Sequence, residues 1–134
     1  MKNFLIAFVS FLVLDFVWLG LIIKNFNERM LADIGRFKDG RFDILYLPAL
    51  GTYVLMALAI TVFVVPRLSP VDASGSFLQA VLMGGLMGLI IFGIFDLTNL
   101  AILKNYPLLF AVVDLCWGTV VFTLVSLVLW RFQG

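Results

Sequence analysis

Histidine is absent from this sequence, and cysteine occurs once, at Cys116. Without histidine the chain cannot form a Ser-His-Asp triad, a Cys-His pair, a His-ligated haem or a usual zinc site. One cysteine cannot form a disulfide within the chain, and without a base or metal partner Cys116 is best interpreted as a small packing residue. We therefore expect no cofactor and no metal, and no catalytic residue can be assigned. The side chains left for chemistry are carboxylates, amides, hydroxyls and aromatics.

Charged residues are scarce as well. They make up 13% of the 134 residues, whereas 63% are hydrophobic and the mean hydropathy is +1.16. A soluble domain usually has about 25% charged and about 45–50% apolar residues, so this chain lacks the polar surface that water requires. Nine basic and eight acidic residues give a net charge of +1, which leaves no basic excess for binding nucleic acid. The composition predicts an integral membrane protein in contact with membrane lipid.

Four apolar runs are long enough to cross a bilayer. The hydrocarbon core is ~30 Å thick and requires about 20 apolar residues in a helix, and no segment alternates as a barrel strand does. The sequence therefore predicts an all-α integral membrane protein, a four-transmembrane-helix bundle in a single transmembrane domain over residues 1–134, with helices at about 4–23, 44–65, 77–103 and 108–130. The first run is too long for a signal peptide, contains Asp15 and lacks a cleavage site of small residues, so we expect it in the mature protein.

A hydrophilic segment, residues 24–43, joins the first two runs and holds five basic and four acidic residues. Gly35 and Gly40 interrupt it, so a solvated loop is one interpretation. Its apolar residues nevertheless recur at helical spacing, which favours a short amphipathic helix on the membrane surface. These residues are Phe26, Met30, Leu31, Ile34 and Phe37.

Three aspartates, Asp15, Asp96 and Asp114, fall inside the predicted spans. Each costs ~2.5–3.5 kcal/mol at the centre of a helix, so their presence requires a reason. Counting ~1.5 Å per residue from the helix ends places all three ~9–12 Å below the same membrane surface. Since no lysine or arginine falls in that layer, we expect the carboxyl groups to interact and to hold one or more protons at neutral pH. The pattern predicts one shared site for a proton or a cation.

Hydrogen-bond donors accompany these aspartates. Trp18 and Trp117 each follow an aspartate by three residues, and Asn99 follows Asp96 by three, so each pair shares a helix face. Tyr53 of the second span lies ~13 Å from the same surface by the same count. All four side chains can donate to a carboxylate. The candidate residues for binding a substrate or a proton are Asp15, Asp96, Asp114, Asn99, Trp18, Trp117 and Tyr53.

Two aromatic residues at the ends of predicted helices have a simpler interpretation. Tyr106 lies beside Pro107, and Trp130 lies beside Arg131. Tyrosine and tryptophan concentrate where the bilayer meets water, so we expect both residues to be interface anchors.

Small residues form a stripe on the third predicted helix, at Ala80, Gly84 and Gly88. Such a stripe allows a second helix to approach closely. The approaching helix belongs either to the same chain or to a second copy in a homodimer, and the sequence leaves both open.

Three strings carry a resemblance to a known family: Leu14-Asp15-Phe16-Val17-Trp18-Leu19-Gly20, Phe95-Asp96-Leu97-Thr98-Asn99-Leu100-Ala101 and Val113-Asp114-Leu115-Cys116-Trp117-Gly118-Thr119. With them, essentially the whole chain resembles the bacterial membrane-protein family catalogued as domain of unknown function 2177. The resemblance implies a small four-helix protein of the bacterial inner membrane and supplies no activity. It also implies that the surface with the second loop faces the cytoplasm, whereas the larger number of basic residues on the opposite surface favours the reverse.

Three functions fit the sequence. The first is binding, and transport, of a small cation or lipophilic solute at the aspartate cluster, with proton exchange. The second is a lipid-modifying enzyme or an accessory subunit that uses an aspartate as general acid or base. The third is a structural membrane protein whose buried polar groups tie its helices together. We rank the enzyme below the first function.

Overall fold

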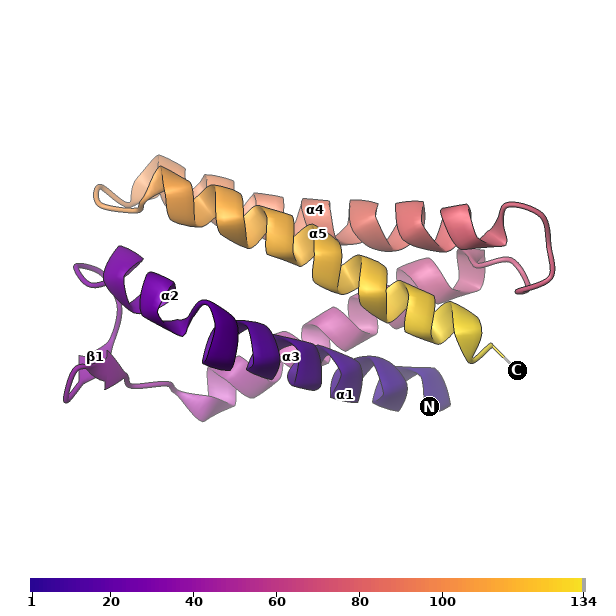
Figure 1. Cartoon of the computed structure of the whole chain (residues 1–134), viewed down its shortest axis with the longest axis horizontal. Coiled ribbons are helices and arrows are strands. Elements are labelled where there is room, and N and C mark those ends of the chain that lie inside the picture. Colours follow the sequence, from indigo (N-terminus) through magenta and orange to yellow (C-terminus); the bar gives the residue numbers. More distant parts are fainter. Residues whose placement is uncertain (134) are drawn as a thin grey trace.

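A computed structural model describes residues 1–133, within which the chain folds into five α-helices and one short β-hairpin (Figure 1). Two helices continue beyond their α-helical part as a π-helical turn. The elements are α1 (Lys2–Val17, continued by the π-helical turn Trp18–Ile22), α2 (Lys24–Met30), β1 (Phe37–Lys38), β2 (Arg41–Phe42), α3 (Tyr46–Ala59, continued by π-helical Ile60–Val64 and the 3-10 turn Val65–Arg67), α4 (Ser76–Ile102) and α5 (Leu108–Arg131).

Four of these helical stretches are long and apolar enough to cross a membrane: Lys2–Ile22, Tyr46–Arg67, Ser76–Ile102 and Leu108–Arg131. Many large apolar side chains on them are exposed, among them Phe16, Leu55 and Leu97. In a membrane these side chains contact lipid, so their exposure carries no hydrophobic penalty. The predicted fold class, an all-α membrane protein with four spans, is confirmed.

The most extensive contact in the bundle is between α4 and α5; in Figure 1 α4 follows the upper edge, and α5 starts beside it and descends towards the C-terminal end. The small residues Ala80, Gly84 and Gly88 of α4 form this contact. A side chain on Gly88 would collide with the backbone of Gly118, and one on Gly84 would collide with Ser126. The Ser126 hydroxyl donates a hydrogen bond to the Ala80 carbonyl oxygen at 2.8 Å. The stripe therefore packs against a helix of the same chain.

A core of apolar side chains joins α1, α3 and α5. Phe11 of α1 packs against Phe122 of α5, with ring centroids 4.7 Å apart, and both side chains are fully buried. Met56 and Ile60 of the second span belong to the same cluster. The two chain ends lie at one end of the bundle, and α2, the hairpin and the connection between α4 and α5 lie at the other (Figure 1).

The segment between the first two spans differs from its prediction. Its helix ends at Met30, and a two-residue turn at Asp39 and Gly40 closes a hairpin instead. Both turn residues have positive φ, 51° and 74°, which is the conformation that an Asp-Gly hairpin turn adopts. Phe37 and Phe42 stack across the strands with ring centroids 4.5 Å apart. The predicted helix through Phe37 is therefore wrong beyond Met30, because the Asp-Gly turn and the paired aromatic rings favour a hairpin.

Candidate functional site

Asp96 of α4 is the most deeply buried carboxyl group, with 2% of its surface exposed. The Tyr106 hydroxyl donates a hydrogen bond to Asp96 Oδ1 at 2.7 Å. Asp96 Oδ2 is also buried and receives no hydrogen bond from the described donors, and the side chain of Asp114 on α5 lies close to Asp96. Because an ionised carboxylate can only accept, a hydrogen bond between these two groups requires a shared proton.

Asp15 of α1 forms a second cluster and is 5% exposed. Trp117 of α5 donates its indole N–H to Asp15 Oδ1 at 2.7 Å, and the Tyr53 hydroxyl of α3 lies within hydrogen-bonding reach of the same carboxyl group. Trp18 stacks on Trp117 with ring centroids 4.6 Å apart and an angle of 11° between the rings. Three helices thus converge on the Asp15 carboxyl group.

Asp114 of α5 lies near both clusters. Asp114 lies near enough to both Asp96 and Asp15 to interact with each charge. Among residues 1–133 no lysine or arginine forms an ion pair with any of the three aspartates, and Lys24 at the membrane edge is instead 4.0 Å from Glu28. We call Asp15, Asp96 and Asp114 together the carboxyl layer. No three acidic, histidine or cysteine side chains in the described part of the chain are close enough to ligate one metal ion.

Two clefts reach the carboxyl layer from different sides. The larger, about 650 Å³, lies between α1, α2, the hairpin and α3, and Asp15 and Tyr53 are among the residues that line it. The smaller, about 280 Å³, lies between α3 and α4 and reaches Asp114. Its other lining residues are Thr52, Met56, Ile91, Phe92 and Phe95. Both clefts have mainly apolar walls.

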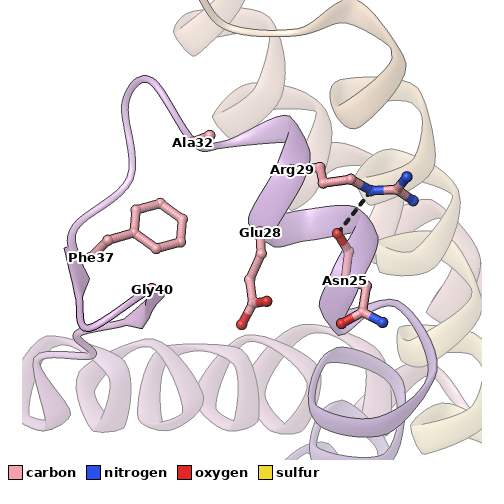
Figure 2. A pocket seen from close by; sticks show the side chains of 6 residues that line it. All are labelled: Asn25, Glu28, Arg29, Ala32, Phe37 and Gly40. Carbon is pink, nitrogen blue, oxygen red and sulfur yellow. Dashed lines mark hydrogen bonds between the residues drawn. The ribbon is translucent and has the colours of Figure 1, made fainter.

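A further cleft of about 550 Å³ lies between α2 and the hairpin, away from the carboxyl layer (Figure 2). Figure 2 shows Glu28 pointing into the space that faces Phe37, whereas Arg29 points to the other side of α2 and donates to the Asn25 carbonyl oxygen at 3.3 Å. The two charged groups do not converge on one point, so this cleft provides no combined site for a charged ligand.

Tyr106 is the site residue that the sequence misassigned. It was expected as an interface anchor, but it is 9% exposed and packs edge-on against Phe110, with ring centroids 5.6 Å apart. Burial and the hydrogen bond to Asp96 raise the pKa of the Tyr106 hydroxyl above its usual value, so the hydroxyl stays a donor. Asn99, expected to face a carboxylate, lies within hydrogen-bonding reach of Tyr106. Tyr106 lies in the short connection between α4 and α5, which brings its hydroxyl to Asp96. The shortness of this connection is the feature of the sequence that could have indicated the contact.

Comparison with known protein families assigns the chain to a family. A family model described as predicted membrane protein, DUF2177, matches residues 1–130. The chain belongs to this family. No curated protein and no solved structure matches it. Family membership and the four candidate spans together identify this DUF2177 protein as a multi-pass integral membrane protein.

Proposed function

We propose that this DUF2177 protein is a transporter of the bacterial inner membrane that binds a small cation or a lipophilic solute at the carboxyl layer and releases a proton in exchange. The observation that carries the proposal is that Asp96 Oδ2 is buried without a hydrogen-bond donor among the described residues, with the Asp114 carboxyl group close to it. Two carboxyl groups that lie close together away from water and without a nearby cation favour holding a proton between them. A cation that enters can replace this proton, because it neutralises the same negative charge.

The clefts support exchange at this position. One leads to Asp15 and the other to Asp114, so a ligand and a proton can reach the carboxyl layer by different routes.

The competing interpretation is a structural role. It is favoured by the two hydrogen bonds that tie helices or loops together, from Trp117 to Asp15 and from Tyr106 to Asp96. Such bonds contribute ~0.6 kcal/mol on average in a membrane protein. A purely structural role predicts that asparagine in place of aspartate changes stability alone.

Flux measurements separate the two functions. The protein is reconstituted into liposomes that contain a pH-sensitive dye, and sodium, potassium or tetraphenylphosphonium is added outside. We expect proton movement that depends on the cation and is lost in Asp96→Asn and Asp114→Asn. Asp72→Asn, the same chemical change in the loop before α4, is the matched control and should retain the flux. Absence of cation-dependent flux, with only a loss of thermal stability in the two variants, would establish the structural role.

A further inference from the structure

Asp114 is the most accessible member of the carboxyl layer. Asp15 and Asp96 are buried, whereas Asp114 is half-buried and lines the smaller of the two clefts described above. That cleft lies between α3 and α4, and of the described residues that line it Asp114 alone is charged. A ligand in this cleft therefore meets the carboxyl layer at Asp114.

The cleft opens within the membrane-spanning part of the molecule and not at its ends. Thr52 follows the first residue of α3 by six positions, and Phe95 precedes the last residue of α4 by seven. At ~1.5 Å per residue both lie ~9–11 Å from the helix ends. Both side chains are exposed, Phe95 by 55%. Exposed side chains at this depth contact lipid, so the cleft opens to the bilayer and not to water.

The cleft exists because the second span diverges from α4. The contacts between them are concentrated at the π-helical turn Ile60–Val64, near the end of the bundle that holds the chain termini. Towards the other end α3 moves away from α4, as their separated ribbons in Figure 1 show. The cleft of about 280 Å³ lies where the two helices have separated, with Asp114 of α5 in its wall.

The lining favours an organic cation with an apolar body. A carboxylate balances a positive charge, and the rings of Phe92 and Phe95 attract one. The hydroxyl of Thr52 donates to the Pro48 carbonyl oxygen at 3.2 Å, so its proton is already engaged. A hydrated inorganic ion would lose its water here without gaining enough oxygen ligands. The volume is near the lower limit of ligand pockets, about 300–1,000 Å³, and suits a small ring.

We propose that the carboxyl layer takes its ligand from the bilayer, and that a lipophilic organic cation enters sideways between α3 and α4 and places its charge at Asp114. The apolar body of the cation lies against Phe92 and Phe95. This inference rests on the proposed function and narrows its ligand to one class. The cleft at Asp15 then remains as the route for the released proton.

Binding is tested with radiolabelled 4-phenylbutylammonium on the full-length protein in phosphatidylcholine nanodiscs, with empty nanodiscs subtracted. The neutral 4-phenylbutanol should compete at least about tenfold more weakly, because a hydrogen bond to a charged group is worth about that factor or more. Asp114→Asn should lose the binding and Asp72→Asn should retain it. Equal competition by the alcohol overturns the proposal, since it would show that the cleft accepts any apolar body, including a lipid acyl chain.

Thr52→Trp closes the cleft without changing a carboxyl group. Because Thr52 is exposed, the variant should keep its thermal stability, and its indole ring should abolish saturable binding of the cation. Thr52→Val removes the hydroxyl without adding bulk and should bind normally. Leu50→Trp adds the same bulk at an exposed residue of α3 outside the cleft lining and should also bind normally. Normal binding by Thr52→Trp, or an equal loss in Leu50→Trp, overturns the route between α3 and α4.

Proton release separates this inference from the transport function. In liposomes that contain a pH-sensitive dye, proton movement driven by 4-phenylbutylammonium should be lost in Thr52→Trp and kept in Thr52→Val. Movement that is lost in Asp114→Asn but kept in Thr52→Trp overturns the lateral route and leaves the transport function standing. Binding that depends on the cleft without any proton release overturns the transport function instead and leaves the binding site standing.

Discussion

At the scale of single residues, the carboxyl layer depends on donors that lie outside the aspartates' own helices. Trp117 of α5 donates to Asp15 of α1, and Tyr106, in the connection between α4 and α5, donates to Asp96. Each donor satisfies one oxygen and leaves the other for a neighbour. Asp96 Oδ2 is thereby left buried without a donor, and the nearby Asp114 is the group with which the proposed proton sharing would occur.

Tyr106→Phe should lower the free energy of unfolding by about 1–3 kcal/mol, because it removes the donor from a buried carboxyl oxygen. The Tyr106 pKa is raised in the folded protein, so the contribution of this hydroxyl is full below the unfolded tyrosine value of about 10 and is lost as the pH rises further. The difference from the unsubstituted protein should therefore shrink above pH about 10. Unfolding in detergent, followed by circular dichroism over a pH series, measures it.

The matched control for that experiment is Tyr46→Phe, since Tyr46 is 84% exposed at the start of α3. It should leave the stability unchanged at every pH. Equal stability of Tyr106→Phe and the unsubstituted protein at neutral pH would show that the hydrogen bond to Asp96 contributes nothing.

At the scale of elements, the close approach of α4 and α5 places Asp96 beside Asp114. Glycines on both helices permit this approach, because the Gly88 and Gly118 backbones meet where any side chain would collide. The third element of the layer, α1, is joined through Trp117 and through the core around Phe11. Just past Asp15 the helix α1 becomes π-helical, a local change that is common at functional sites.

Gly88→Ala should therefore destabilise the protein by about 1–3 kcal/mol, as overpacking of a close contact usually does, and should reduce cation-dependent flux because it separates Asp96 from Asp114. Gly51→Ala is the control, since a side chain there meets no atom within 4 Å. The measurements are detergent unfolding and the liposome assay. A Gly88→Ala protein with normal stability and flux would show that the α4–α5 distance does not control the carboxyl layer.

At the scale of the whole molecule, the number and the approximate bounds of the membrane spans could be predicted from the sequence. The four spans follow from hydropathy, because lipid admits only helices of that length. The grouping of the aspartates was predicted from residue counts along straight helices, and the structure places Asp114 near the other two, whereas their common role stays a prediction. Which helices are neighbours could not be predicted, because apolar residues surround each span on all sides and no face is distinguished. Tyr106 was misassigned because it lies in a connection, whose folding depends on a turn.

The central claim is that Asp15, Asp96 and Asp114 form one group that holds a proton and gives it up when a cation binds. Infrared difference spectroscopy of the reconstituted protein, with and without 4-phenylbutylammonium or sodium at neutral pH, measures this directly through the C=O stretch of protonated carboxyl groups. We predict that cation binding reduces this band, that Asp96→Asn and Asp114→Asn abolish the change, and that Asp72→Asn preserves it. A spectrum with no protonated carboxyl band that responds to any cation, or a response unaltered in Asp114→Asn, would contradict the claim.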